Sequence, residues 1–198
     1  MRRTCPPLVG VLLPHCDPFR CQLLSPESVD HHAGPGAQGR VGVVEVGLHA
    51  LGAGLLVALA ADLRICSTDA VLGLLAARYG LFPALGTFRL PRLIGLGPAR
   101  RLILSGETVD PEEAYRLGLV DHLVAADRFA EGVDELVARY AALSPAAAAA
   151  IKHLTARAFD TTRDAALADA VPLLQRCLAA PHVADASAVW RARSAGRS

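Results

Sequence analysis

The hydrophobic pattern of the chain changes at residue 41. Residues 1–40 hold six of the thirteen prolines and three of the five cysteines, with no sustained period of helix or strand. From residue 41 onwards, apolar positions recur at strand and helix spacing. We therefore expect an irregular or poorly ordered leader over 1–40, a core over 41–97, and a helical region over 98–198.

The first patterned segment predicts a strand, a turn, a helix and a second strand. Residues 41–46 form a β-branched run typical of a buried strand, and Gly47 ends it. Residues 55–61 are apolar on nearly every helical face, which indicates a buried helix. Residues 63–66 predict the next strand. A βαβ unit of this kind favours an α/β fold with a parallel sheet.

The clearest helix boundary lies at Asp110. Asp110 can cap the helix, Pro111 suits the first helical position, and Glu113 completes a capping box. Gly118 supplies the matching stop.

Three further helices are predicted towards the C-terminus. Residues 128–143 carry a one-sided apolar stripe at helical spacing, which must pack on another surface. Residues 146–158 follow as a helix, and residues 164–178 predict another that Pro172 kinks or divides. The stripe consists of Phe129, Val133, Leu136, Val137 and Tyr140.

Composition excludes two classes of partner. Twenty basic and nineteen acidic residues give a net charge of +1, so no general field recruits nucleic acid or an anionic membrane. Residues 41–61 approach the length of a membrane span, but Glu45 and His49 interrupt them. We predict neither nucleic-acid binding nor a membrane span.

The cysteines point to a reducing compartment. Five cysteines at irregular spacing do not form a disulfide framework, so we expect a cytoplasmic protein. The His and Cys residues of the leader lack the pairs that set up a tetrahedral site, so we predict no metal. These residues are His15, Cys16, Cys21, His31 and His32.

The sharpest local feature is the sequence Gly52-Ala53-Gly54 between the first strand and the helix. Small residues there let a ligand approach the backbone, and N–H groups at a helix N-terminus stabilise an oxyanion or a phosphate. The spacing fits neither a dinucleotide fingerprint nor a phosphate loop, because Val57 stands where the last glycine of GxGxxG is needed. The alternative is that Gly52 and Gly54 only permit tight packing of strand against helix.

Several ordered motifs together resemble the central signature of the enoyl-CoA hydratase/isomerase (crotonase) family. The resemblance covers about residues 41–193. It rests on the segments 49–54, 62–65, 80–90, 94–95, 104–107, 113–114 and 118–120, on Ser144-Pro145 with Lys152, and on 188–191.

This resemblance implies a partial ββα spiral core followed by helices that drive assembly. It also implies an acyl-CoA ligand, with coenzyme A as part of the substrate and no separate cofactor. The partners would be further copies in a homotrimer or hexamer, or a homologous subunit. By alignment, the backbone N–H of Ala53 would hold the thioester oxygen, and Ala53 is small enough to replace glycine there.

The chain departs from the family at both glutamate positions of the hydratases. Alignment places those positions at Leu56 and Ala76, and neither side chain can exchange a proton. We also find no counterpart of the family's second oxyanion donor in residues 1–40. Either the first spiral turns are absent, or the leader reflects a misplaced start or an altered reading frame.

Other residues near the implied site have two interpretations. The candidate pocket consists of His49, Tyr79, Gly80, Leu81 and Pro83. His49 and Tyr79 could take over chemistry, but a turn histidine and a packing tyrosine are the simpler interpretation.

Two hypotheses follow for function. The first is a family protein of fatty acid metabolism, a lyase or isomerase by resemblance, that binds acyl-CoA with doubtful activity. The second is a catalytically inactive pseudoenzyme or assembly subunit of a crotonase-family oligomer.

Overall fold

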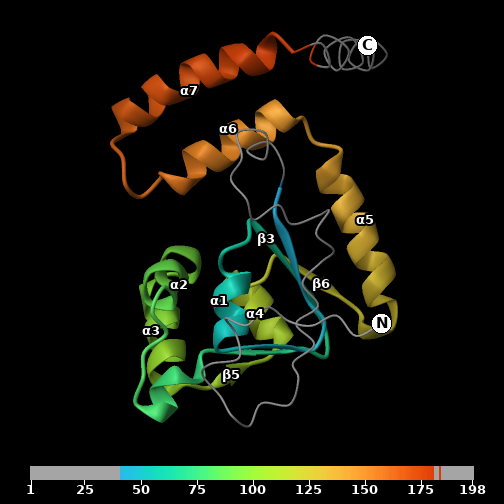
Figure 1. The fold of residues 1–198 in the computed structure, drawn as a ribbon, viewed down its shortest axis with the longest axis vertical. Coiled ribbons are helices and arrows are strands. Elements are labelled where there is room, and N and C mark those ends of the chain that lie inside the picture. The colour runs from blue at the N-terminus through green and yellow to red at the C-terminus, as the bar shows by residue number, and fades with distance from the viewer. Residues whose placement is uncertain (1–40, 181–182, 184–198) are drawn as a thin grey trace, which may run out of the picture. The chain divides into compact units, whose positions relative to one another are not determined.

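The computed structural model describes residues 41–180 and 183, which fall into two compact units. The first unit holds residues 42–137, and the second holds residues 138–180 with 41 and 183 (Figure 1). The predicted leader lies outside the described residues. The division into 1–40, 41–97 and 98–198 stays a prediction.

A parallel three-stranded sheet forms one layer of the first unit. Its order is β1 (Val43–Val46), β3 (Leu63–Ser67) and β6 (His122–Val124). Val43 pairs with Leu63 at the start of the register. The predicted strands over 41–46 and 63–66 are confirmed, as is their parallel pairing.

A second small sheet has the order β2 (His49–Leu51), β4 (Val71–Gly73) and β5 (Thr108–Val109). Strand β2 pairs with β4 in parallel, and β4 pairs with β5 antiparallel. Strands of two or three residues are too short to show a period of two, which is why the pattern along the chain did not predict them.

The chain alternates between the two sheets. It passes from β1 to β2 and then into α1 (Ala53–Ala58), and from β3 to β4 and then into the 3-10 helix η2 (Leu75–Tyr79). This ββα order confirms the spiral core implied by the family resemblance. The local interpretation as βαβ was incomplete, because it placed only one strand before the turn.

Helix α1 is shorter than the predicted helix over 55–61. It starts two residues earlier and ends at Ala58. The N–H groups of Ala60 and Ala61 donate to carbonyls three residues back, at 2.9 and 3.2 Å, so the last turn tightens and the helix stops.

Residues 41–61, which approach the length of a membrane span, are divided among β1, β2 and α1. No helix among the described residues is long and apolar enough to cross a membrane.

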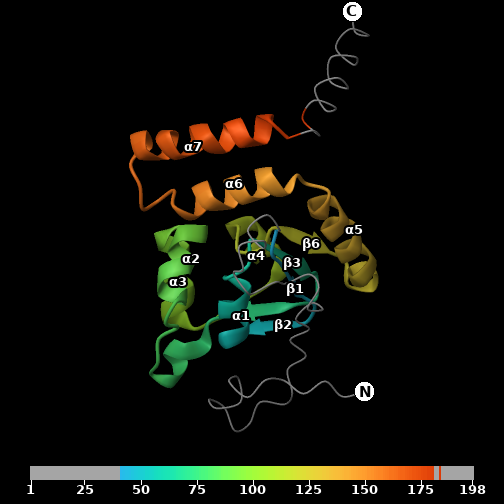
Figure 2. The same cartoon turned by 45° about the horizontal axis from the view of Figure 1, so that its top comes forward.

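Two helices pack as a hairpin beside the sheets (Figure 2). They are α2 (Gly86–Ile94) and α3 (Leu96–Ser105), joined at Gly95, whose φ of 83° favours glycine. The helical hairpin therefore begins at Gly86, whereas the sequence pattern predicted that the helical region starts at Pro98.

Helix α4 (Pro111–Leu117) follows the predicted boundaries. The Asp110 carboxylate accepts from the Glu113 N–H at 2.7 Å, and Gly118 ends the helix at φ 78°. The second half of the capping box differs from the prediction. The Glu113 carboxylate accepts from Arg116 at 2.6 Å and from Arg101 at 3.2 Å, because charged donors make stronger bonds than a backbone N–H.

Helix α5 (Phe129–Ala141) carries the predicted apolar stripe. Val133 is 3% exposed, and the other four stripe residues are half-buried. This face packs as the sequence predicts. The helix crosses the boundary between the two units at Val137.

The second unit contains α6 (Pro145–Ala156) and α7 (Arg163–Leu178), which pack against each other. Arg157 and Asp169 join them by an ion pair of 2.8 Å. Pro172 lies inside α7 without dividing it, so of the two predicted effects the division is wrong and the kink stays a prediction.

Candidate functional site

The turn between β2 and α1 has a backbone that only glycine adopts readily. Gly52 has φ 54° and ψ −116°, in a region that L side chains avoid. Its N–H donates to the Gly73 carbonyl of β4 at 2.9 Å. The turn is thus fixed to the second sheet at the point where α1 begins.

The N-terminus of α1 presents backbone donors at an open surface. The first hydrogen bond of the helix runs from the Leu56 N–H to the Gly52 carbonyl at 3.2 Å, so the N–H groups of Ala53 and Gly54 precede it. Ala53 is exposed, and a Cβ added at Gly52 or Gly54 would meet no described atom within 4 Å. Such donors can stabilise an oxyanion.

Leu56 lies one turn further along α1 and packs among apolar neighbours. A Cβ built on Gly86 would stand 2.9 Å from Leu56 Cδ2, 3.2 Å from Leu74 Cδ1 and 3.3 Å from Pro83 Cβ. Leu56 itself is partly buried against the hydrophobic core. The side chain at this position therefore fills a packed apolar space, with Gly86 leaving the room that it needs.

Ala76 lies in the 3-10 helix η2 and is half-buried. Its carbonyl accepts from the Leu81 N–H at 3.0 Å, and Gly80 ends η2 at φ 71°. A methyl group and an occupied carbonyl offer no proton to exchange.

The candidate pocket residues separate into two groups. Pro83 is buried and adjoins Gly86, so the structure brings it to the same cluster as Leu56. His49 is exposed at the start of β2, while Tyr79 and Leu81 are 71% and 62% exposed. These three lie at the surface.

The sequence interpretation missed the neighbours that surround Leu56. Leu74 is 1% exposed, and Gly86 is buried at the first position of α2. Gly86 lies within segment 80–90, which is part of the family resemblance, so the sequence contained a signal that this glycine belongs to the site. Nothing in the local pattern indicates that the leucine at 74 would meet the leucine at 56.

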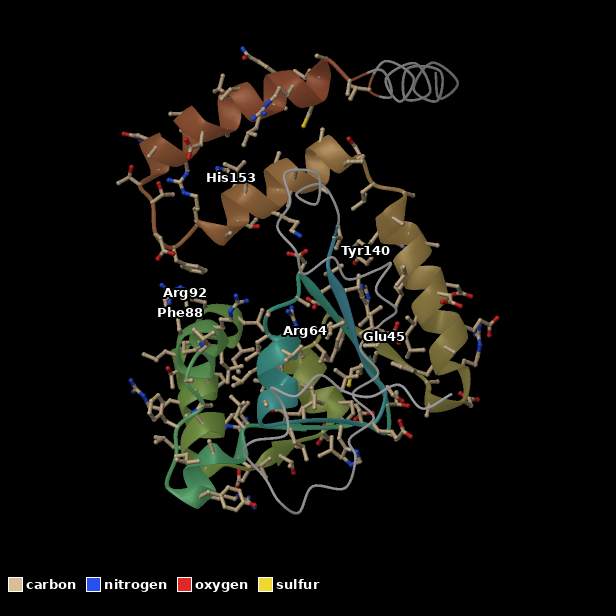
Figure 3. The ribbon with its side chains drawn as sticks, in the orientation of Figure 1. Glu45, Arg64, Phe88, Arg92, Tyr140 and His153 are labelled. Carbon is tan, nitrogen blue, oxygen red and sulfur yellow. The ribbon has the colours of Figure 1, made fainter. Side chains whose placement is uncertain are left out.

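Two ionisable groups on the strands β1 and β3 have raised pKa values. Burial raises the pKa of Glu45 on β1, and the nearby Asp134 adds to the rise (Figure 3). Burial also raises the pKa of the Cys66 thiol on β3 to about 12, helped by Asp69 and Glu112. A thiol of that pKa is almost wholly protonated at neutral pH and is a poor nucleophile.

Comparison with known proteins points to one family. The family model described as enoyl-CoA hydratase/isomerase matches residues 41–187. A Bacillus subtilis protein named as an enoyl-CoA hydratase/isomerase is 42% identical over 113 residues, which are 57% of this chain and 44% of that protein.

Solved structures agree in fold. An enoyl-CoA hydratase subunit I from Geobacillus kaustophilus is 28% identical with a TM-score of 0.71, over 76% of this chain and 59% of that chain. An enoyl-CoA hydratase from Thermobifida fusca in complex with acetoacetyl-CoA is 35% identical with a TM-score of 0.66, over 72% and 57%.

The chain spans less than half of the Bacillus relative and about three fifths of the two solved structures. The family model matches residues 41–187, which are most of this chain. This chain therefore belongs to the enoyl-CoA hydratase/isomerase family and has its crotonase fold.

Proposed function

We propose that the chain binds an acyl-CoA thioester at the turn before α1, with the Ala53 N–H directed at the thioester oxygen. The observation that carries this proposal is the turn at Gly52, whose φ of 54° and ψ of −116° glycine adopts readily and which starts a helix beside open space. Glycine at such a turn lets a ligand approach the backbone closely.

The ligand class is supported by a relative. The Thermobifida structure is a complex with acetoacetyl-CoA. An acyl-CoA ligand brings its own coenzyme A, so the proposal needs no separate cofactor.

Hydration is the activity that this site does not support. Adding water to an enoyl thioester needs a group that transfers protons, and such a group contributes about 10²–10⁴-fold to the rate. Leu56 and Ala76 stand at the two aligned positions. We propose that the chain retains binding and has at most trace hydratase activity.

A second candidate function is that of an assembly subunit without catalysis. It is favoured by four apolar side chains on α7 that stay 56–62% exposed, since a surface of this kind suits another subunit. The partner would be further copies, as a homotrimer or hexamer, or a homologous family member.

The location that fits best is the cytoplasm. Cys66 is a buried free thiol and Cys177 a half-buried one, as a reducing compartment maintains.

Binding of crotonyl-CoA and acetoacetyl-CoA to the full chain, measured by calorimetry, tests the proposal. Ala53→Val should abolish binding, because a β-branched side chain restricts the turn and blocks approach to the N–H. Ala53→Gly should bind like the unaltered chain, with a stability cost of up to about 1 kcal/mol. Circular dichroism shows whether each variant is folded.

The outcomes separate the two candidates. No binding by the unaltered chain would favour the assembly subunit. Equal binding by Ala53→Val would show that Ala53 is not the donor. Hydratase turnover at the rate of an ordinary family member would contradict the alignment of Leu56 and Ala76.

A further inference from the structure

Helix α1 is hydrogen-bonded to a neighbouring element at each end. Before its first residue, the Gly52 N–H donates to the Gly73 carbonyl of β4 at 2.9 Å. At its last turn, Nη1 of Arg89 on α2 donates to the Leu59 carbonyl, also at 2.9 Å. Leu59 is the C-cap of α1, and Arg89 lies 30 residues further along the chain. The arginine therefore holds the opposite end of the helix from the Ala53 N–H.

Helix α2 meets α1 at two matched positions. A Cβ built on Gly86 would stand 2.9 Å from Leu56 Cδ2, and Arg89 bonds Leu59. On each helix the two positions are three residues apart, so both contacts lie on one side of that helix. In both views α1 lies between the strands and the α2–α3 hairpin (Figures 1 and 2). The hairpin thus fixes one side of α1, and the second sheet fixes its start.

Helix α1 is too short to hold its position by itself. It has six residues, and an isolated helix in water is marginal below about 12–15 residues. Leu55 and Ala58 are each 2% exposed, so apolar packing covers one face. Such packing is non-directional, whereas a hydrogen bond prefers a near-linear geometry. The hydrogen bonds at its two ends therefore decide how α1 is aimed.

The Arg89 guanidinium is available for this bond. Residues 70–106 contain no acidic residue, and Arg89 forms no ion pair with any residue that the structure describes. The last carbonyls of a helix lack partners within it, and a charged donor bonds such a group about twice as strongly as a neutral one. An apolar side chain at position 89 would leave the carbonyl of Leu59, a residue only 5% exposed, without this donor.

We propose that Arg89 is a positioning residue for acyl-CoA binding: it holds the C-terminal end of α1 and thereby keeps the Ala53 N–H directed at the thioester oxygen. The inference rests on the proposed site at the turn before α1, and Arg89 acts through α1 rather than through contact with the ligand. Without the Arg89 bond, α1 samples other orientations. Only molecules with α1 in place then bind, so the apparent affinity falls in proportion to their fraction.

Three full-length variants separate positioning from support of the fold. Arg89→Met keeps the apolar stem and removes the donor. Arg89→Lys keeps a cationic donor, and a single bond from one nitrogen does not need the guanidinium fork. Arg100→Met removes an exposed arginine from α3 of the same hairpin and is the matched control. Circular dichroism shows whether each variant is folded, and Arg89→Gln replaces Arg89→Met if that variant does not fold.

Amide hydrogen exchange tests the anchor without ligand. The N–H groups of Leu56 and Leu59 donate within α1 at 3.2 and 2.9 Å, so their exchange reports the opening of α1. In Arg89→Met this exchange should be about tenfold faster than in the unaltered chain, while the N–H of Ala114 in α4 keeps its rate. Arg89→Lys and Arg100→Met should stay within about threefold of the unaltered chain. Unchanged exchange in Arg89→Met would overturn the proposal.

Calorimetry with acetoacetyl-CoA tests the effect on binding. Arg89→Met should bind about tenfold more weakly, Arg89→Lys should bind within about threefold of the unaltered chain, and Arg100→Met should bind like it. An arginine that only stabilises the fold would lower the urea midpoint and leave the affinity of the folded chain unchanged, and that result would also overturn the proposal. If the unaltered chain binds nothing while Arg89→Met still exchanges faster, the acyl-CoA site itself is refuted, and with it the role of Arg89 in binding.

Discussion

Buried Arg64 on β3 and half-buried Asp121 before β6 form an ion pair, with 2.7 Å between Arg64 Nη2 and Asp121 Oδ2 (Arg64 is labelled in Figure 3). The same carboxylate accepts from the Arg64 N–H at 2.7 Å, and Arg64 Nε donates to the Leu119 carbonyl at 2.8 Å. Burial lowers the pKa of Arg64, while Asp121 opposes that shift. The arginine thus ties β3 to the segment that leads into its neighbouring strand.

Arg64→Ala should destabilise the first unit by about 1–3 kcal/mol, because it leaves the half-buried Asp121 carboxylate and the buried Leu119 carbonyl without their cation. Urea unfolding followed by circular dichroism measures the change. The exposed pair of Arg128 and Glu131 provides the control, and Arg128→Ala should alter stability by no more than about 0.5 kcal/mol. A similar small loss for both variants would contradict the role given to Arg64.

The sequence predicts those elements whose signals are local. Asp110 caps its helix and Gly118 ends it, because capping depends on residues within one turn. Strand β2 and the early start of the α2–α3 hairpin escaped prediction, because their positions depend on pairing with β4 and on packing with distant residues. Pro172 shows the same effect, since the helix continues through it.

The site, too, can be predicted from the sequence only where its signals are local. The small residues of the turn and the apolar nature of Leu56 and Ala76 are visible in the sequence, but the packing of Leu56 against Gly86 is a long-range contact. The surface positions of His49 and Tyr79 depend on their strand and helix. Their roles in binding stay predictions.

Gly86 and Leu56 should be energetically coupled. Gly86→Ala places a methyl group 2.9 Å from Leu56 Cδ2, so the leucine must shift, at a cost of about 1–3 kcal/mol. In a Leu56→Ala background the same substitution should cost less, because only the contacts of 3.2 Å with Leu74 and 3.3 Å with Pro83 remain. A double-mutant cycle in urea measures the coupling, and additive effects would show that the two sites do not interact.

Glu45 should make stability depend on pH. Its folded-state pKa is raised above the ordinary value of 4.5, so folding favours the protonated form. The penalty for the ionised form appears as the pH rises above 4.5 and through the folded pKa. The stability of Glu45→Gln relative to the unaltered chain should therefore increase between about pH 4 and about pH 8.

Urea unfolding at several pH values measures this trend. Glu107→Gln, which removes an exposed carboxylate, serves as the control for the loss of one charge. Parallel curves for Glu45→Gln and the unaltered chain would rule out a contribution from Glu45.

Helix α7 carries an apolar stripe that its partner helix does not cover. Ala166, Ala170, Leu173 and Cys177 are half-buried, whereas a neighbouring face stays 56–62% exposed. That exposed stripe consists of Leu167, Val171, Leu174 and Leu178. Spacings of four, three and four residues keep the stripe on one side of the helix, as in a seam between packed helices.

Self-association of the full chain through this stripe is the expected consequence, and replacing Val171 and Leu174 with Gln should reduce it. The two side chains are mostly exposed, so their replacement should change the unfolding free energy by no more than about 0.5 kcal/mol each. Sedimentation velocity at micromolar concentration should show a shift towards the monomer that persists at high salt, since burial of apolar surface drives this contact. Ala168→Gln, which adds the same amide at an exposed position beside the stripe, should leave the association unchanged. A double variant that sediments like the unaltered chain would place the association on another surface, because the stripe would then contribute no buried area.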